Sequence, residues 1–383
     1  MSKLEVKVTG VFNLLKHPNA DKLEIAEVGG KGGYVSVVGK DQFKPGDFMI
    51  YVPVDAVLPD TVSKKLQENS KITIGPRIRT ARIRGVLSQG LCLKAAEWLS
   101  PDQILESTDV SEILGIKKYQ PPEPEFKGFA GRGISISYQN ENFDKYTDVE
   151  HFAKFPSSIK EGTPVVATVK YHGTNFRAGL VRKPFYKDSP FLRLVKKIGY
   201  FFGITASQHE FLVGSHNTIR KVSKTLGVLG VDDLYWKIAL KYNVQKVCEQ
   251  EMTTNIEIDN IIIYGEIVGP GIQKGYSYGI EPGDHQLVIF DIKVNGRYLS
   301  WPKVVELATK YGLIYTTVAF SGPFDAKVLD LAEAIDVYSG QEHIREGLVI
   351  RPIEESYDVC LGRVILKRVS AAYLMDSSNS DFH

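Results

Sequence analysis

Short apolar runs rich in valine and isoleucine recur along the chain and alternate with turn residues. In the first hundred residues these runs cover 34–38, 47–54 and 83–91, with glycine, proline or asparagine between them. Later runs cover 165–169, 261–268, 287–292, 346–351 and 364–369. β-Branched residues favour strands, and short strands separated by turns are typical of a small barrel. The sequence therefore predicts a strand at each run and a barrel in the N-terminal part.

Other segments predict helices and a domain boundary. Apolar residues at three- and four-residue intervals predict helices over 234–251 and 301–311. The proline-rich stretch 121–125 can continue neither a helix nor a central strand, and three glycines follow it within ten residues. We therefore expect an α+β chain of three parts, namely a barrel domain over 1–105, a linker over 106–145 and a domain of antiparallel β-sheets with flanking helices over 146–383.

Charged residues beside the later runs carry the candidate chemistry. Lys170 directly follows the run at 165–169, and Gly173 would let a ligand approach the backbone. Because the pKa of a free lysine is about 10.4, a nucleophilic lysine needs neighbours that favour its neutral form. A charge within an apolar strand is costly unless it has a partner. Such charges occur at Glu266, Asp291, Glu346 and Lys367.

The order of these residues resembles the motif series of the covalent nucleotidyltransferases, which include polynucleotide ligases and mRNA-capping guanylyltransferases. The matching segments are Lys170-Tyr171-His172-Gly173, Tyr264-Gly265-Glu266, Phe290-Asp291, Glu346-Gly347 and Ile365-Leu366-Lys367. The resemblance covers about the C-terminal 230 residues. It implies that the lysine of the first motif attacks the α-phosphate of a nucleotide and forms a lysyl-nucleotide intermediate.

Two departures from the commonest pattern indicate a branch of this superfamily. His172 and Asn175 stand where DNA ligases and capping enzymes usually carry Asp and Arg, and K-x-H-G-T-N is similar to nick-sealing RNA ligases. The chain ends soon after Lys367, which leaves too little sequence for the C-terminal OB-fold domain of most DNA ligases and capping enzymes. Instead, H-P-N-A-D-K-L at 17–23 and I-R-G-V-L-S-Q-G-L at 83–91 resemble tRNA-binding OB-fold modules. Together they resemble the protist-type RNA ligases that seal nicks in duplex RNA.

The resemblance assigns a role to each candidate residue. Catalysis would rest on Lys170, Lys367 and Glu346. The cofactors would be ATP and Mg²⁺ or Mn²⁺, with the metal ion held by Glu346, Glu266 and Asp291. His172 is expected to position other groups, because a lone histidine beside an apolar strand is more often a hydrogen-bonding residue than a proton carrier. The expected ATP-binding residues are Val169, Lys170, His172, Asn175, Ser215, His216, Glu266, Phe290, Glu346, Ile365 and Lys367.

The RNA-binding surface is predicted from an arginine-rich segment of the N-terminal domain. Arg77, Arg79, Arg82 and Arg84 alternate with isoleucines, so on a strand they would project in pairs towards phosphates. The same pattern also fits a solvated strand whose arginines prevent edge pairing. Net charge does not distinguish these two interpretations, because the chain has 47 basic and 45 acidic residues. The expected partner is RNA with 3′-hydroxyl and 5′-phosphate ends, in a nicked duplex.

Composition limits the class of protein to which the chain can belong. No run reaches the roughly twenty apolar residues of a membrane span. The three cysteines lack metal-site spacing. We expect an intracellular monomer, and the sequence does not identify its compartment. Two alternatives remain open, namely another covalent nucleotidyltransferase, such as a DNA ligase or capping guanylyltransferase, or a tRNA-binding module fused to an inactive nucleotidyltransferase-like domain.

Overall fold

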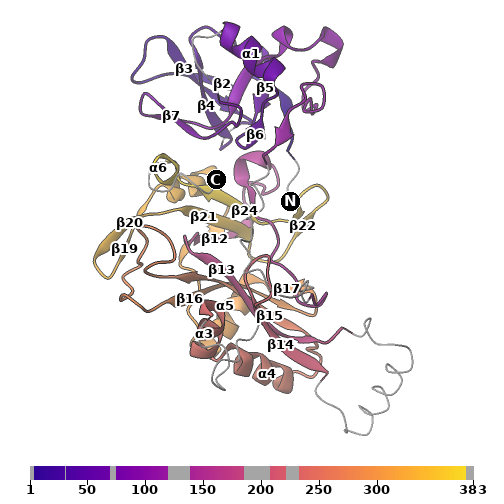
Figure 1. Ribbon diagram of the computed structural model, residues 1–383, viewed down its shortest axis with the longest axis vertical. Coiled ribbons are helices and arrows are strands. Elements are labelled where there is room, and N and C mark those ends of the chain that lie inside the picture. Colours follow the sequence, from indigo (N-terminus) through magenta and orange to yellow (C-terminus); the bar gives the residue numbers. More distant parts are fainter. Residues whose placement is uncertain are drawn as a thin grey trace, which may run out of the picture.

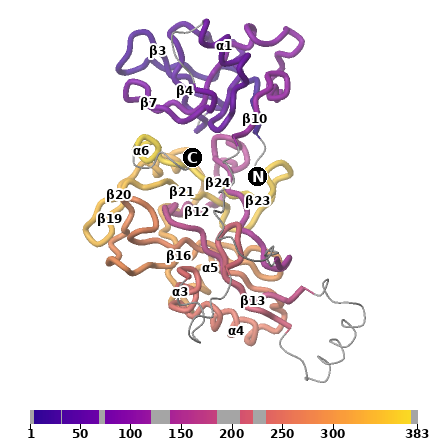
Figure 2. Tube along the Cα trace, in the orientation of Figure 1, coloured from indigo at the N-terminus to yellow at the C-terminus, as the bar shows by residue number. Residues whose placement is uncertain are grey.

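The computed structural model describes residues 4–30, 32–69, 75–119, 139–184, 208–220 and 233–376. A smaller N-terminal domain lies at one end of an elongated molecule, and a larger sheet-rich domain forms the rest (Figure 1). The Cα trace shows the C-terminal helix close to the boundary between them (Figure 2). Residues 120–138 of the expected linker lie outside the described residues. Within those residues, no helix is long and apolar enough to cross a membrane.

The N-terminal domain consists of short antiparallel strands and one α-helix. Its elements are β1 (Lys7–Gly10), β2 (Asn13–Lys16), β3 (Leu23–Val28), β4 (Tyr34–Gly39), β5 (Phe48–Val52), β6 (Ala56–Val57), α1 (Asp60–Asn69), β7 (Ala81–Ile83), β8 (Val86–Ser88), β9 (Leu91–Lys94) and β10 (Lys117–Lys118). Strands β2-β3-β4 and β1-β5-β9 form two three-stranded sheets. Alternate residues such as Val8, Ile50 and Leu93 face one buried core. The predicted pattern of short strands is confirmed.

The N-terminal domain extends beyond the predicted boundary at residue 105. Val110, Leu114 and Ile116 are buried in the same core as β1 and β5. Strand β10 then pairs with β6. Residues 106–118 therefore belong to this domain and not to the linker, because their apolar side chains complete its core. The other end of the predicted linker is also packed, since Phe143 is buried against the second domain.

The second domain contains two five-stranded sheets and several short hairpins. Its strands are β11 (Glu150–His151), β12 (Pro164–Val169), β13 (Thr174–Arg182), β14 (His209–Gly214), β15 (Ile261–Val268), β16 (Gln286–Val294), β17 (Arg297–Tyr298), β18 (Val318–Pro323), β19 (Ile335–Tyr338), β20 (Gln341–Ile344), β21 (Gly347–Pro352), β22 (Tyr357–Asp358), β23 (Gly362–Arg363) and β24 (Leu366–Val369). One sheet has the order β11-β24-β21-β12-β18 and the other β14-β13-β15-β16-β17. All pairs are antiparallel except β11 with β24.

Three helices cover the β13-β15-β16 sheet, namely α3 (Leu234–Lys241), α4 (Val244–Thr254) and α5 (Trp301–Lys310). Trp236, Val247 and Val304 of these helices share one core with Ile263 and Ile289 of the sheet. The helix predicted over 301–311 is confirmed. The single helix predicted over 234–251 is wrong, because Asn243 adopts a left-handed conformation with φ 49° and separates α3 from α4.

The two domains meet through β11 and β24 on one side and the β3–β4 hairpin on the other. The ring of His151 in β11 stacks on Tyr34 at a centroid distance of 5.2 Å, and Tyr34 stacks in turn on Tyr51 at 5.2 Å. The guanidinium of Arg368 in β24 donates a hydrogen bond of 3.3 Å to the carbonyl of Gly32. His151 also pairs in register with Lys367. The domain contact therefore lies directly beside a predicted catalytic residue.

Candidate active site

Lys170 lies where the two large sheets of the second domain come together. It follows β12, and its backbone N–H donates to the carbonyl of Gly347 at 2.9 Å. Gly173 begins the turn into β13, and a Cβ at this glycine would lie 2.3 Å from the carbonyl oxygen of Ile267. Glycine is therefore required here because β15 passes too close for any side chain, and not only to admit a ligand. The K-x-x-G spacing thus fixes Lys170 against the neighbouring sheet.

The ammonium of Lys170 forms an ion pair with the carboxylate of Glu346. Only 3% of Glu346 is exposed, and its second oxygen, Oε2, is buried without a hydrogen-bond partner. Burial alone would lower the pKa of Lys170, but the carboxylates of Glu346 and Glu266 outweigh it and raise that pKa above its ordinary value. Without substrate, the lysine is therefore held as an ammonium.

Glu266 enters the same site from β15. Asn175 of β13 lies opposite it in the register, and the Oδ1 atom of Asn175 is buried without a hydrogen-bond partner. The pKa of Glu266 is raised to about 8, because burial and the charge of Glu346 outweigh the opposing effect of Lys170. The Asn175 side chain thus retains hydrogen-bonding capacity that the protein itself does not use.

A cavity of about 180 Å³ adjoins these side chains. Six of the predicted ATP-binding residues line it, namely Val169, Lys170, Asn175, Glu266, Phe290 and Ile365. Its other lining residues are Tyr146, Val149, Thr168, Tyr171, Thr316, Val349 and Arg351. The aromatic ring and the aliphatic side chains suit a flat apolar group, and Asn175 and Glu266 add polar groups to the same wall as Lys170. This arrangement fits a nucleotide whose phosphates point towards Lys170.

Lys367 supplies a second cation next to this cavity. It lies in β24, opposite Val349 of β21. Burial lowers the pKa of its ammonium, the charge of Lys170 lowers it further, and Glu346 opposes both effects. A half-buried cation near Lys170 can stabilise negative charge that develops on a phosphate between the two lysines.

Comparison with known proteins identifies the family of this chain. A family model described as RNA ligase matches residues 163–369, which is more than half of the chain. The chain belongs to the RNA ligase family. A second model, described as an OB-fold domain, matches residues 6–95. The N-terminal domain of this RNA ligase family member is thus an OB-fold barrel.

Solved structures show the same fold over the whole length of the chain. An RNA ligase of Naegleria gruberi, solved as a point variant with ATP and Mn, has 21% sequence identity and a TM-score of 0.66, and the match covers 99% of this chain and 100% of that chain. The same Naegleria gruberi enzyme with PPi has 22% identity and a TM-score of 0.64, with 98% of each chain covered. No curated protein matches the sequence.

The ligase does not bring Asp291 into a metal site, and this prediction is corrected. Asp291 is fully buried, and its Oδ2 atom is 2.7 Å from Nη1 of Arg351, 2.7 Å from Nη1 of Arg363 and 2.8 Å from the hydroxyl of Tyr146. These three partners already satisfy the Oδ2 atom, which is therefore not free to bind a metal ion. Among the described residues, no group of three His, Cys, Asp or Glu side chains could hold a metal ion. Glu346 and Glu266 remain as candidates.

The network around Asp291 is a part of the site that the sequence did not reveal. The ring of Tyr146 meets that of Phe290 at a centroid distance of 4.8 Å, and Arg351 donates to the carbonyl of Phe290 at 3.2 Å. Phe290 is thereby held at the wall of the cavity. A tyrosine 145 residues away from its carboxylate partner gives no local pattern, although Asp291 within an apolar strand signals that a buried cation must lie nearby.

Ser215 and His216 do not line the cavity. They follow β14, where the carbonyl of Ser215 accepts a hydrogen bond of 3.0 Å from Nε of Arg177. The His216 ring lies 3.9 Å from the carboxylate of Asp148. Their expected contact with ATP therefore has no support in the geometry of the protein alone.

His172 faces Glu346 and the C-terminal helix α6 (Ala371–Met375). Its Nδ1 atom is 3.8 Å from Oε2 of Glu346 and 3.2 Å from the hydroxyl of Tyr373, and its backbone N–H donates to the hydroxyl of Tyr278 at 2.7 Å. Burial lowers the pKa of the His172 ring, against the effect of Glu346. These contacts fix the orientation of the ring, and the positioning role of His172 stays a prediction.

The four arginines of the predicted RNA-binding segment do not lie on one strand. Arg77 lies outside the named strands, forms a 2.7 Å ion pair with Asp55 and stacks on Tyr119 at 3.7 Å from the ring centre. Only Arg82 lies in β7, and Arg84 occupies the following turn with φ 48°. Arg79, Arg82 and Arg84 are exposed. The expected alternation is therefore wrong, because turns separate these residues, but three exposed cations remain on this surface.

Proposed function

We propose that this RNA ligase family member uses ATP to seal a 3′-hydroxyl/5′-phosphate nick in duplex RNA, as a monomer, through a lysyl-AMP intermediate at Lys170. The observation that carries the proposal is the ion pair of Lys170 with the buried Glu346, beside a cavity that Lys170, Val169, Phe290 and Ile365 line. A charged pair buried beside a cavity is typical of a functional site, whereas an ordinary surface lysine has no buried carboxylate partner.

ATP is expected to bind with its adenine against Phe290 and Ile365 and with the backbone at Val169 along the base edge. The ribose hydroxyls would lie near Asn175 and Glu266. The buried Oδ1 atom of Asn175 has no partner in the protein, so a hydroxyl donor would satisfy it. The Naegleria gruberi relative was solved with ATP and Mn, which supports the choice of nucleotide.

A divalent cation fits the same site. The buried Oε2 atom of Glu346 lacks a partner, and carboxylate oxygens are the ligands that Mg²⁺ and Mn²⁺ prefer. Glu346, together with Glu266, would hold the ion. When bound, it supplies positive charge that offsets the triphosphate and weakens the hold of Glu346 on the proton of Lys170.

Lys170 must lose its proton before it can attack. Its pKa is raised in the protein alone, so the neighbouring charges have to change when substrates bind. Lys367 favours the neutral form of Lys170, because two like charges in a poorly solvated site repel one another. It would also hold the α-phosphate as negative charge develops there. His172 would keep the Glu346 carboxylate in place.

The proposed reaction has three steps. The Nζ atom of Lys170 bonds to the α-phosphorus of ATP, the bond to the bridging oxygen breaks, and pyrophosphate leaves. An oxygen of the RNA 5′-phosphate then displaces the lysine and takes the AMP group. Finally, the RNA 3′-hydroxyl attacks that 5′-phosphorus, forms the phosphodiester bond and releases AMP.

A sealing assay tests this function. The purified chain is incubated with ATP and Mg²⁺ and with a nicked RNA duplex, an all-DNA nick of the same sequence or the single-stranded RNA ends. We expect sealing of the RNA nick, loss of sealing with Lys170→Ala, and normal sealing with Lys303→Ala, which removes an exposed lysine of α5. Preferential sealing of the all-DNA nick would instead favour a DNA ligase, and unchanged sealing by Lys170→Ala would contradict the mechanism.

A further inference from the structure

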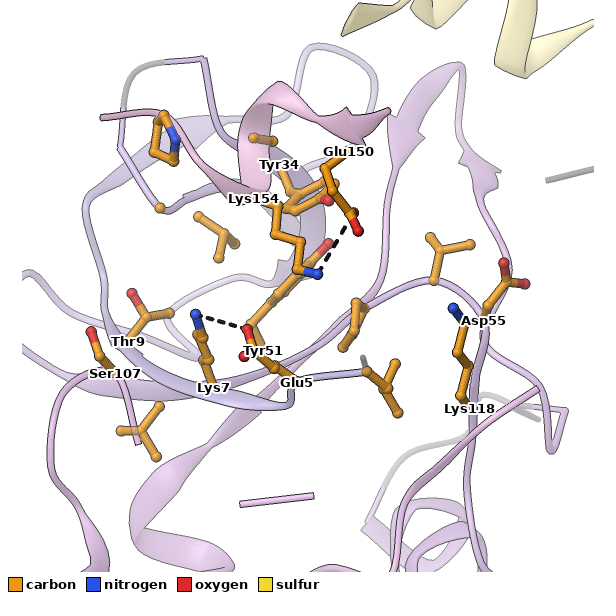
Figure 3. Close-up of a pocket in the computed structure, with 18 residues that line it drawn as sticks. Glu5, Lys7, Thr9, Tyr34, Tyr51, Asp55, Ser107, Lys118, Glu150 and Lys154 are labelled. Carbon is orange, nitrogen blue, oxygen red and sulfur yellow. Dashed lines mark ion pairs between the residues drawn. The ribbon is translucent and has the colours of Figure 1, made fainter. Parts of the chain in front are cut away.

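A second cavity, of about 340 Å³, lies between the OB-fold barrel and the second domain. Strands β1, β3, β4 and β5 form one wall, and residues 150–156 form the opposite wall. Figure 3 shows lysines and carboxylates that reach this space from both domains. The volume falls within the range of about 300–1,000 Å³ that is usual for binding sites of small molecules.

The polar side chains of this cavity are evenly balanced in charge. Three lysines, Lys7, Lys118 and Lys154, face three carboxylates, Glu5, Asp55 and Glu150. Lys7 pairs with Glu5 at 3.0 Å and Lys154 pairs with Glu150 at 3.6 Å (Figure 3). Each pair joins two residues of the same domain and is partly exposed. Because such pairs contribute only about 0–1 kcal/mol, a ligand can replace them at little cost.

Apolar and aromatic surface separates these charges. Val8, Val28 and Tyr51 are buried residues that line the cavity, and Tyr34 lies beside them. A simple polyanion is disfavoured because three carboxylates accompany the three lysines, and a purely apolar ligand is disfavoured by all six charges. A ribonucleotide fits, because its phosphate needs cationic donors, its hydroxyls need acceptors and its base needs an apolar wall.

The cavity is close to the proposed site of phosphate transfer. Glu150 forms β11 together with His151, and β11 pairs with β24 so that His151 lies opposite Lys367. Glu150 is thus next in the chain to the residue opposite Lys367, and its negative charge opposes the lowering of the Lys367 pKa by burial.

We propose that this cavity between the domains binds one ribonucleotide of the RNA substrate, an inference that rests on the proposed RNA ligase function. Lys7 and Lys154 contact its phosphates, and Glu5 and Glu150 accept hydrogen bonds from ribose hydroxyls. The 2′-hydroxyl distinguishes RNA from DNA, so the carboxylates contribute to the choice of RNA. The two domains then hold the substrate jointly, since each contributes one lysine and one carboxylate.

The test measures binding of a fluorescent nicked RNA duplex to the full chain over a series of salt concentrations. The variant Lys7→Gln/Lys154→Gln is compared with Lys16→Gln/Lys303→Gln, which loses the same charge at exposed positions outside the cavity. Each lost phosphate contact lowers the slope of log affinity against log salt by about 1, so we expect a reduction of about 2 for the first variant only. Equal slopes in both variants would overturn the proposal.

Two further measurements make the result specific. Transfer of label from ATP to the protein should stay normal in the Lys7→Gln/Lys154→Gln variant, because neither lysine belongs to the ATP site. Glu5→Ala, which removes the acceptor oxygens, should lower the ratio of RNA affinity to DNA affinity for the same sequence, and an unchanged ratio would contradict the role of the carboxylate. If the unmodified chain takes no label from ATP, the proposed function fails, while the binding comparison still decides whether the cavity holds RNA.

Discussion

At the scale of single residues, the pair of Lys170 with Glu346 determines the charge of the nucleophile. Glu346→Gln keeps the shape of the side chain but removes its negative charge. We expect protein adenylation to fall by about 10²-fold, because an uncharged amide would hold the divalent cation at the α-phosphate poorly, and the loss of one preorganised electrostatic contact typically has this effect. The initial rate of label transfer from ATP measures it, with Glu342→Gln on the exposed β20 as the matched control. A rate within twofold of the unmodified chain would exclude Glu346 from the mechanism.

Glu266 should make the stability of the folded chain depend on pH. Its pKa rises from an ordinary value of 4.5 to about 8 through burial, so between these values the folded chain keeps a proton that the unfolded chain has lost. The contribution of Glu266 to stability is therefore present in full below pH 4.5 and is lost as the pH rises through 8. Glu266→Gln should remove this loss and raise the melting temperature by several degrees relative to the unmodified chain at pH 8.5, but not at pH 4.5. Parallel pH profiles of melting temperature would contradict the assignment.

At the scale of elements, the break between α3 and α4 depends on one asparagine. Asn243 has φ 49° and ψ 37°, a conformation that is readily adopted by glycine and tolerated by asparagine. Asn243→Gly should leave the free energy of unfolding nearly unchanged, whereas Asn243→Val should lower it by about 1–2 kcal/mol. Urea unfolding of the two variants provides the comparison. Equal stability would mean that the helices can join without this turn.

The strands and helices also differ in how well the sequence predicted them. Runs of β-branched residues located β12, β15 and β16, because local spacing determines which residues face the core. The break at Asn243 was not predicted, because the apolar spacing continues across it. Contacts between distant residues were not predicted for a different reason. Neither the Tyr146–Asp291 hydrogen bond nor the wall of the cavity between the domains corresponds to a local sequence pattern.

At the scale of the whole molecule, His151 reports on the contact between the domains. Burial, together with the cations Arg368 and Lys367, lowers the pKa of its ring to about 3. Tyr34→Ala removes the ring that covers it, so the pKa of His151 should rise towards 6.5 in an NMR titration. Tyr357→Ala, at an exposed tyrosine of β22, serves as the control. An unchanged titration of His151 would mean that Tyr34 does not keep water from this contact.

The central claim is that Lys170 becomes covalently bound to AMP. The most direct measurement incubates the chain with Mg²⁺ and α-phosphate-labelled ATP or GTP, followed by a denaturing gel, because only a covalent adduct keeps the label on the protein. We predict label from ATP with the unmodified chain and with Lys303→Ala, and none with Lys170→Ala. Label from GTP would instead indicate capping chemistry, and label retained by Lys170→Ala, or absent from the unmodified chain, would contradict the proposed mechanism.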